Sequence, residues 1–395
     1  MELKQGIHLG YCTNIHRGET WEETFAGLSQ HTDRVRQRVS PVDPFAIGLR
    51  LGCDAINELN RDAATKKDFA NWLEKTNSYL FTINGFPYGR FHGGRVKEQV
   101  YAPDWTSRDR LEYTNALFDF VSELAPAGHE VSVSTLPGSF KEFIQPATEK
   151  EQLQAIIDNI RACSRHIDTL REKTGRDIHL GMEPEPLGLF ENTAESLDFF
   201  DKLVDGLSAD ESAAVLRNIG INYDTCHFAI EFEDAAESLS RLTANGIRIS
   251  KIHLSSALTL PPTDGNVERL ATFQDEVYLH QTIIQSQGEV THRFRDIPDV
   301  LEWYPENKDQ AGDEWRVHFH IPLHAEPDGD FGDTTRQISG VLSEVAKNPE
   351  MCRHFEMETY TWEVLPVEMQ SGDVVDQLVS EYEWCLDKFK TSDLI

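Results

Sequence analysis

The chain of 395 residues is long enough for two average domains or for one large barrel with insertions. It carries 67 acidic against 37 basic side chains, so its formal net charge is −30. A surface with this charge repels nucleic-acid phosphate and anionic lipid, which argues against both as partners.

Eight strand-like apolar runs follow one another along the chain, and most are separated by segments with helical apolar spacing. After the fifth run, Asn192 and Glu195 resemble a capping box that opens a helix. Apolar residues from Val374 to Phe389 recur at helical intervals and predict a closing helix. The predicted strands cover residues 7–13, 45–51, 79–85, 130–136, 178–183, 219–224, 247–254 and 352–359.

This alternation predicts an α/β fold of the (β/α)8 TIM-barrel type rather than a doubly wound open sheet. No Gly-x-Gly-x-x-Gly motif follows the first strand, which argues against a dinucleotide-binding fold. We expect one domain over residues 1–395, with a long loop at 86–105 and an insertion at 255–327. The insertion contains strand-like pieces at 277–284 and 316–323, so we expect a lid or small subdomain at the barrel mouth.

Acidic and imidazole side chains stand at the ends of the last four predicted strands. The sixth strand ends in Asp224-Thr225-Cys226-His227, although an Asp-x-x-His can also be a helix N-cap followed by a surface histidine. Glu183, His253 and Glu358 hold similar places on the fifth, seventh and eighth strands. These side chains converge in a barrel, and a divalent cation would relieve the repulsion between three carboxylates. Mixed oxygen and imidazole ligands suit Mn²⁺, Co²⁺, Mg²⁺, Fe²⁺ or Zn²⁺ about equally.

The set Glu183, Asp224, His253 and Glu358 resembles the metal site of the xylose-isomerase-like TIM barrels. That group includes sugar isomerases, epimerases and endonuclease-IV-type enzymes, and the resemblance implies that these four residues are metal ligands. Glu185 is the alternative to Glu183 as the first ligand. The Asp-Thr-Cys-His string resembles the endonuclease-type signature, which implies a further metal held by His227 with His318 and His320.

A closer resemblance covers most of the chain. The strings LGYCTNIH at 9–16, FTINGFPYG at 81–89 and MEPEP at 182–186 resemble the Ebo-cluster E proteins, a group of xylose-isomerase-like barrels called metabolite traffic proteins. This resemblance implies that the protein handles a small metabolite as its partner, without specifying which one.

Further side chains are candidates for substrate contacts or proton transfer. Loop residues Arg90, His92 and Arg95 could bind a substrate phosphate or carboxylate, or could be neutralised by nearby acids. His16 follows the first strand, and Lys251 shares a strand face with His253, so each is a candidate proton-transfer or oxyanion-stabilising group as well as a structural one. Glu185 and Trp362 complete the candidate pocket.

The leading function predicted from these residues is a metal-dependent isomerase or epimerase for a sugar-like polyol or ketose, free or phosphorylated. The metal would hold two substrate oxygens, while Glu183 and Glu358 remove and return a proton. One alternative is a metal-dependent phosphodiesterase of the endonuclease type. The other is a non-catalytic metabolite-binding or traffic protein, because membership of a fold does not establish catalysis.

The sequence also indicates where the protein resides. No apolar segment typical of a signal peptide follows residues 1–6, and no apolar run is long enough to span a bilayer. The six cysteines are scattered without a Cys-x-x-Cys pair, which is typical of a reducing compartment. We therefore expect a cytoplasmic protein without membrane insertion, and no pattern points to a particular oligomeric state.

Overall fold

Eight parallel strands form the main sheet of the computed structural model, which describes residues 1–87, 97–366 and 372–395. Their order is β1-β13-β7-β6-β5-β4-β3-β2, and a parallel bridge between Cys12 and Gly48 joins the two edges into a barrel. The strands are β1 (His8–Tyr11), β2 (Phe45–Arg50), β3 (Ser78–Asn84), β4 (Val131–Thr135), β5 (Ile178–Met182), β6 (Ile219–Asp224), β7 (Ile249–Leu254) and β13 (His354–Met357).

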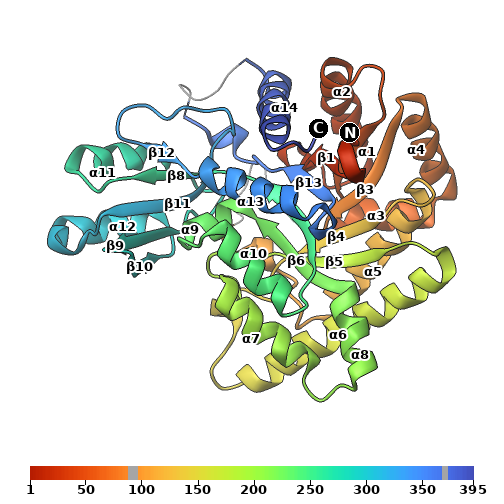
Figure 1. The fold of residues 1–395 in the computed structure, drawn as a ribbon, viewed down its shortest axis with the longest axis horizontal. Helices are drawn as coiled ribbons and strands as arrows, with labels where there is room; N and C mark the ends of the chain where they lie inside the picture. Colours follow the sequence, from red (N-terminus) through yellow and green to blue (C-terminus); the bar gives the residue numbers. More distant parts are fainter. Residues whose placement is uncertain (88–96, 367–371) are drawn as a thin grey trace.

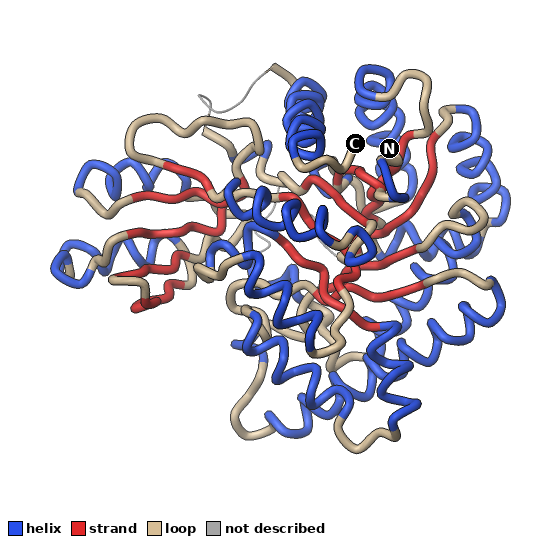
Figure 2. The backbone as a smooth tube through the Cα atoms, viewed as in Figure 1, coloured by secondary structure: helices blue, strands red, loops and turns tan. Residues whose placement is uncertain are grey.

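Helices surround this sheet, as Figures 1 and 2 show. Each barrel strand is an almost continuous buried run, because its residues face either the helix layer or the barrel interior. The helices outside the insertion are α1 (Trp21–Gly27), α2 (Asp33–Val39), α3 (Cys53–Arg61), α4 (Ala63–Lys75), α5 (Arg108–Leu124), α6 (Glu149–Thr174), α7 (Thr193–Val204), α8 (Ala209–Asn218), α9 (Thr225–Ile230), α10 (Ala235–Ala244), α13 (Thr335–Lys347) and α14 (Val374–Thr391). The predicted (β/α)8 barrel is thus confirmed, with every strand where the sequence placed it.

The start of α7 differs in one detail from the expected capping box. The Asn192 side chain accepts a hydrogen bond from the Glu195 amide at 3.0 Å, as an N-cap should. The Glu195 carboxylate, however, accepts from the Glu191 amide and pairs with Lys141. The helix therefore has the predicted cap without the reciprocal bond, because a nearby cation competes for the carboxylate.

The barrel interior holds a buried ion pair between Lys251 of β7 and Glu356 of β13. Both side chains are fully buried, and Asn84 of β3 accepts from the Lys251 ammonium at 2.9 Å and donates to Glu356 at 3.0 Å. Gly48 leaves room for this pair, since a Cβ at that position would lie 1.6 Å from Glu356 Oε1. Glycine is required here by close packing rather than by backbone conformation.

A second, antiparallel sheet follows β7 and lies beside the barrel, at the left of Figure 1. Its strand order is β10-β9-β11-β8-β12, and residues such as Leu260, Phe273 and Trp315 form a core of its own. The elements are β8 (Ala257–Leu260), α11 (Asp264–Leu270), β9 (Thr282–Ser286), β10 (Glu289–Phe294), α12 (Ile297–Trp303), β11 (Glu314–His320) and β12 (Gly332–Asp333).

We call this second sheet with α11 and α12 the subdomain; its strands β9 and β11 overlap the two expected strand-like pieces. After residue 327, β12 also pairs with β8, before α13 begins. Among the described helices, none combines the length and apolar character needed to cross a membrane.

Candidate metal and substrate site

Four side chains from consecutive strands of the barrel meet at its C-terminal mouth. Glu183 follows β5 directly, Asp224 ends β6, His253 lies in β7 and Glu358 follows β13. One ligand atom from each lies within 4.8 Å of the others, and each residue is at most 4% exposed. We call this set the mouth cluster. Consecutive barrel strands open at the same edge of the sheet, which is why residues from four separate segments converge here.

Neighbouring side chains fix the orientation of the carboxylates in the mouth cluster. Asn222 donates to Glu183 Oε2 at 2.7 Å, Asn14 donates to Glu358 Oε1 at 2.9 Å, and Ser255 donates to Asp224 Oδ1 at 2.6 Å. The other oxygens of Glu183 and Glu358 face His253 Nδ1 at 3.2 and 2.7 Å. Asp224 Oδ2 is buried without a hydrogen-bond partner among the described residues.

The charge balance of the mouth cluster favours a bound cation. Burial alone would lower the pKa of His253, but Glu358, Cys12 and Glu183 outweigh burial and raise it well above the usual value. In the metal-free protein a proton on His253 therefore compensates part of the carboxylate charge. Three carboxylates, one of which has a buried oxygen without a partner, and one imidazole form a donor set that fits a divalent cation.

Three further histidines approach the mouth cluster, and we call them the histidine trio: His227 of α9 with His318 and His320 of β11. The structure shows that the insertion supplies two of them. Ligand atoms of Asp224, His227 and His320 lie within 4.8 Å of one another. The subdomain thus contributes side chains to the barrel mouth in addition to standing beside it.

The hydrogen bonds of the trio define its tautomers. His227 Nδ1 donates to the Pro184 carbonyl at 3.0 Å, His318 Nδ1 to Gln281 Oε1 at 2.7 Å, and His320 Nδ1 to the Glu358 carbonyl at 2.9 Å. Each Nε2 is then an acceptor, and burial lowers the pKa of His227 and of His318. The two Nε2 atoms of His227 and His318 nevertheless lie 3.0 Å apart, and His320 Nε2 is buried without a partner among the described residues.

Such an arrangement fits a second cation. Two neutral imidazole nitrogens that face each other with lone pairs repel, whereas a shared metal ion removes the repulsion. Metal-ligating histidines commonly donate their other ring N–H to a carbonyl or carboxylate, as all three members of the trio do here.

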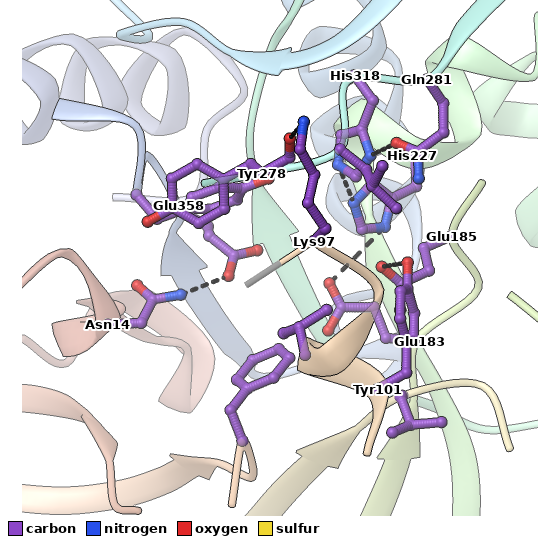
Figure 3. A pocket seen from close by; sticks show the side chains of 15 residues that line it. Asn14, Lys97, Tyr101, Glu183, Glu185, His227, Tyr278, Gln281, His318 and Glu358 are labelled. Carbon is purple, nitrogen blue, oxygen red and sulfur yellow. Dashed lines mark hydrogen bonds and ion pairs between the residues drawn. The ribbon is translucent and has the colours of Figure 1, made fainter. Parts of the chain in front are cut away.

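A pocket opens above these groups, with an atom-free volume of about 770 Å³ including its solvent-open part. Glu183, Glu358, His227 and His318 line it, which places ligand atoms of both sets in the pocket wall (Figure 3). Its size is that of a small-molecule site. Glu185 also lines the pocket; burial and the neighbouring Glu183 raise its pKa well above the usual value, and Tyr101 donates to it at 3.1 Å.

Other residues predicted for the site lie in different surroundings. Lys251 is buried deeper in the barrel, with its ammonium bound to Glu356 and Asn84. His16 hydrogen bonds to Tyr11 at 2.8 Å and stacks on His31. Trp362 packs against both the barrel core and the subdomain core. Arg90, His92 and Arg95 lie outside the described residues.

Several polar side chains of the site carried no signal in the sequence. Asn14, Asn222 and Ser255 hold the three carboxylates, and Gln281 orients His318. Asparagine and serine are common in loops and strands for other reasons, so residue type alone does not single them out. Asn14 lies close to the end of the first predicted strand, and that position was the one available hint.

Comparison with known proteins now places the chain in a family. The family model described as xylose isomerase-like TIM barrel matches residues 45–283, which is more than half of the chain. The protein belongs to the xylose isomerase-like TIM barrel family. The matched residues include Glu183, Asp224 and His253 of the mouth cluster, whereas Glu358 lies beyond them. A search of curated proteins gave no match.

Two solved structures of similar fold illustrate this membership. A xylose isomerase-like TIM barrel protein from Mycobacterium smegmatis, in complex with magnesium, has a TM-score of 0.54 at 10% identity and covers 99% of each chain. A D-tagatose 3-epimerase-like protein has a TM-score of 0.50 at 13% identity and covers 98% of each chain. At these identities the likeness shows a shared fold.

Proposed function

We propose that this protein is a metal-dependent isomerase or epimerase acting on a small hydroxy-carbonyl compound of the sugar or polyol type. The observation that carries the proposal is the mouth cluster, where Glu183 and Glu358 reach the pocket from different strands beside a fitting cation position (Figure 3). The descriptions of two similar barrels as a magnesium complex and as epimerase-like are compatible with it. Within the family, assignment to the Ebo-cluster E group is part of the proposal.

In this mechanism the protein moves a proton between two faces of one carbon, or between two neighbouring carbons while a hydroxyl proton moves to the former carbonyl oxygen. When bound, a divalent cation supplies Lewis-acid polarisation of the substrate carbonyl. One of Glu183 and Glu358, as the carboxylate, removes the proton from the carbon next to the carbonyl, and the other, as the carboxylic acid, returns a proton. Asn222 and Asn14 hold the two carboxyl groups in place.

The charges around the pocket support a small uncharged substrate. Lys97 is the one lysine or arginine among the described lining residues, and its ammonium is bound by Asp296 at 2.6 Å and by two backbone carbonyls. It is therefore not available to neutralise a substrate phosphate. The protein's net charge of −30 points in the same direction.

Proton exchange with solvent tests this function without knowledge of the natural substrate. Metal-loaded protein is incubated in D₂O with dihydroxyacetone and hydroxyacetone, and deuterium incorporation next to the carbonyl is followed by NMR. We expect exchange in the native protein and at least a hundredfold loss in Glu183→Gln and in Glu358→Gln. Glu276→Gln, an exposed acidic position, is the matched control. Exchange that persists in both variants would contradict the assignment, and a metal-loaded protein that binds without exchange would indicate a binding protein.

A second candidate, a dinuclear hydrolase acting on phosphodiesters, is favoured by the contact between His227 Nε2 and His318 Nε2 at 3.0 Å. Two cations about one shared carboxylate are typical of hydrolases that activate water. Metal analysis separates the candidates. Two tightly bound ions per chain, together with hydrolysis of bis(p-nitrophenyl) phosphate that His318→Gln abolishes, would establish the hydrolase. One ion per chain and no hydrolysis would exclude it.

A further inference from the structure

The pocket wall away from the metal ligands is largely apolar. Phe86, Val100, Leu136 and Leu279 line it together with Tyr101, Tyr278 and Tyr360. These residues come from the end of β3, from the segment after residue 96, from the end of β4, from the insertion and from the segment after β13. Five separate segments therefore contribute side chains to one apolar lining.

Three polar groups on this part of the wall already have partners. Lys97 is held by Asp296 and by the carbonyls of Asp275 and Tyr278. The Tyr101 hydroxyl donates to Glu185. Gln281 uses Oε1 for His318 and donates through Nε2 to the Pro186 carbonyl at 3.2 Å. These bonds reduce the number of donors that a substrate hydroxyl could use here.

One polar atom with free hydrogen-bonding capacity lies beside the ligands. Asn14, which donates to Glu358, has a buried Oδ1 with no partner among the described residues. The pocket wall thus combines the polar groups of the mouth cluster and the histidine trio with an apolar lining from five segments. A polyol with hydroxyls along its whole length would leave those that face the apolar lining without partners.

We propose that the substrate is a hydroxy-carbonyl compound with its oxygen atoms at one end and a hydrocarbon body at the other. The oxygen-bearing end meets the metal ligands, and the hydrocarbon body packs against Val100, Leu279 and the tyrosine rings. This inference rests on the proposed metal site and narrows its substrate class. Apolar contact supplies the binding energy, since burial of hydrocarbon surface is favourable in proportion to its area.

Two hydroxamic acids test the inference, because both chelate divalent cations and they differ in their hydrocarbon part. Binding of acetohydroxamate and benzohydroxamate to the Mn²⁺-loaded full-length protein is measured by isothermal titration calorimetry. We expect benzohydroxamate to bind at least tenfold more tightly. Equal affinities would overturn the inference and leave the metal site intact. Absence of metal-dependent binding of either compound would overturn the proposed metal site and the inference with it.

A matched pair of variants shows where the preference arises. Leu279 is half-buried in the pocket wall, whereas Leu301 is half-buried on α12 against the subdomain core. We expect Leu279→Gln to reduce the benzohydroxamate preference at least threefold with acetohydroxamate affinity unchanged. Leu301→Gln should leave both affinities as they are. A preference that survives Leu279→Gln and the parallel Val100→Gln would place the phenyl ring elsewhere and overturn the inference.

Discussion

The two ends of the barrel each hold a cluster of histidine and carboxylate groups, and they are built differently. The mouth cluster has three carboxylates and one imidazole, whereas Glu130, His179 and His354 at the opposite end form what we call the floor cluster. In both clusters the candidate ligand atoms lie within 4.8 Å of one another. Proximity alone therefore does not distinguish a metal site from a structural one.

The difference lies in how the charges are compensated. In the floor cluster Arg248 donates to Glu130 at 2.6 Å, and His179 Nε2 donates to the same oxygen at 2.7 Å. Ser250 hydrogen bonds to His179 Nδ1 and Ser132 to His354 Nδ1, while His354 Nε2 is buried without a partner among the described residues. In the mouth cluster no lysine or arginine of the described chain forms an ion pair with Glu183, Asp224 or Glu358. We therefore propose the mouth cluster, which has no lysine or arginine partner among the described residues, as the cation site.

The largest effect is expected where buried charges already compensate each other. Lys251→Met leaves Glu356 without its ammonium partner inside the barrel, which should cost about 3–5 kcal/mol of unfolding free energy. Chemical denaturation of the metal-free protein measures this loss. The double variant Lys251→Met/Glu356→Met should recover most of it, and Glu183→Gln at the mouth should cost little or nothing. A large loss of unfolding free energy in Glu183→Gln would mean that other groups of the protein already compensate the charge of the mouth carboxylates.

Metal binding should stabilise the protein through the mouth cluster alone. A free Mn²⁺ or Zn²⁺ concentration of a hundred times the dissociation constant adds about 2.7 kcal/mol to the unfolding free energy. We expect Asp224→Asn to abolish this gain and Glu130→Gln in the floor cluster to retain it. Thermal and chemical unfolding with and without the metal provide the measurement. If Glu130→Gln removes the stabilisation by metal, the floor cluster binds the metal and the proposed difference between the two ends is wrong.

Acid should destabilise the floor of the barrel. Burial, His129 and the N-terminal ammonium lower the pKa of His8 to about 3, and burial also lowers the pKa of His179 and of His354. These residues are neutral in the folded protein but bind protons in the unfolded chain below about pH 6.5, so stability falls as the pH falls through that value. For His8 the loss at pH 5 is about 2 kcal/mol.

Unfolding curves of the metal-free protein between pH 7.5 and pH 5 check the sign of this dependence. His8→Asn is the informative variant, since its stability should depend less steeply on pH than that of the native chain. A His8→Asn variant whose stability depends on pH as steeply as that of the native chain would contradict the neutral state of His8.

The smallest expected effect concerns the groups that orient the mouth ligands. Ser255 donates to Asp224 Oδ1 at 2.6 Å, and Ser255→Ala removes that bond without removing a ligand. Loss of such an orienting contact typically lowers metal affinity about tenfold or more. Competition with a fluorescent chelator measures the affinity. Ser250→Ala at the floor is the matched control and should leave the affinity unchanged.

The barrel was predictable because its strands are long, apolar and separated by amphipathic helices. Strands β8, β10 and β12 of the subdomain were not found. β12 has only two residues, and β10 alternates exposed and half-buried side chains such as Arg293 without a clear apolar face. Such edge strands are defined by their partners in the sheet, so local sequence carries little of the signal.

The site shows a similar division. The ends of strands can be recognised from local sequence, and a barrel brings the ends of its strands to one edge. The sequence therefore predicted that Glu183, Asp224, His253 and Glu358 meet. Lys251 shares the inward face of β7 with His253, but two residues along a strand is roughly 6–7 Å, so it lies one layer deeper. His318 and His320 reach the mouth only through the fold of the insertion, and the resemblance to known enzymes was the one signal for them.

An anomalous difference map from crystals of the Zn²⁺-loaded protein, measured at the zinc absorption edge, tests the central claim most directly. We predict a peak within bonding distance of Glu183, Asp224, His253 and Glu358, and no peak between Glu130, His179 and His354. A second peak at the histidine trio would favour the dinuclear hydrolase. An empty mouth cluster, or a zinc ion at the floor instead, would contradict the claim that uncompensated carboxylates mark the metal site.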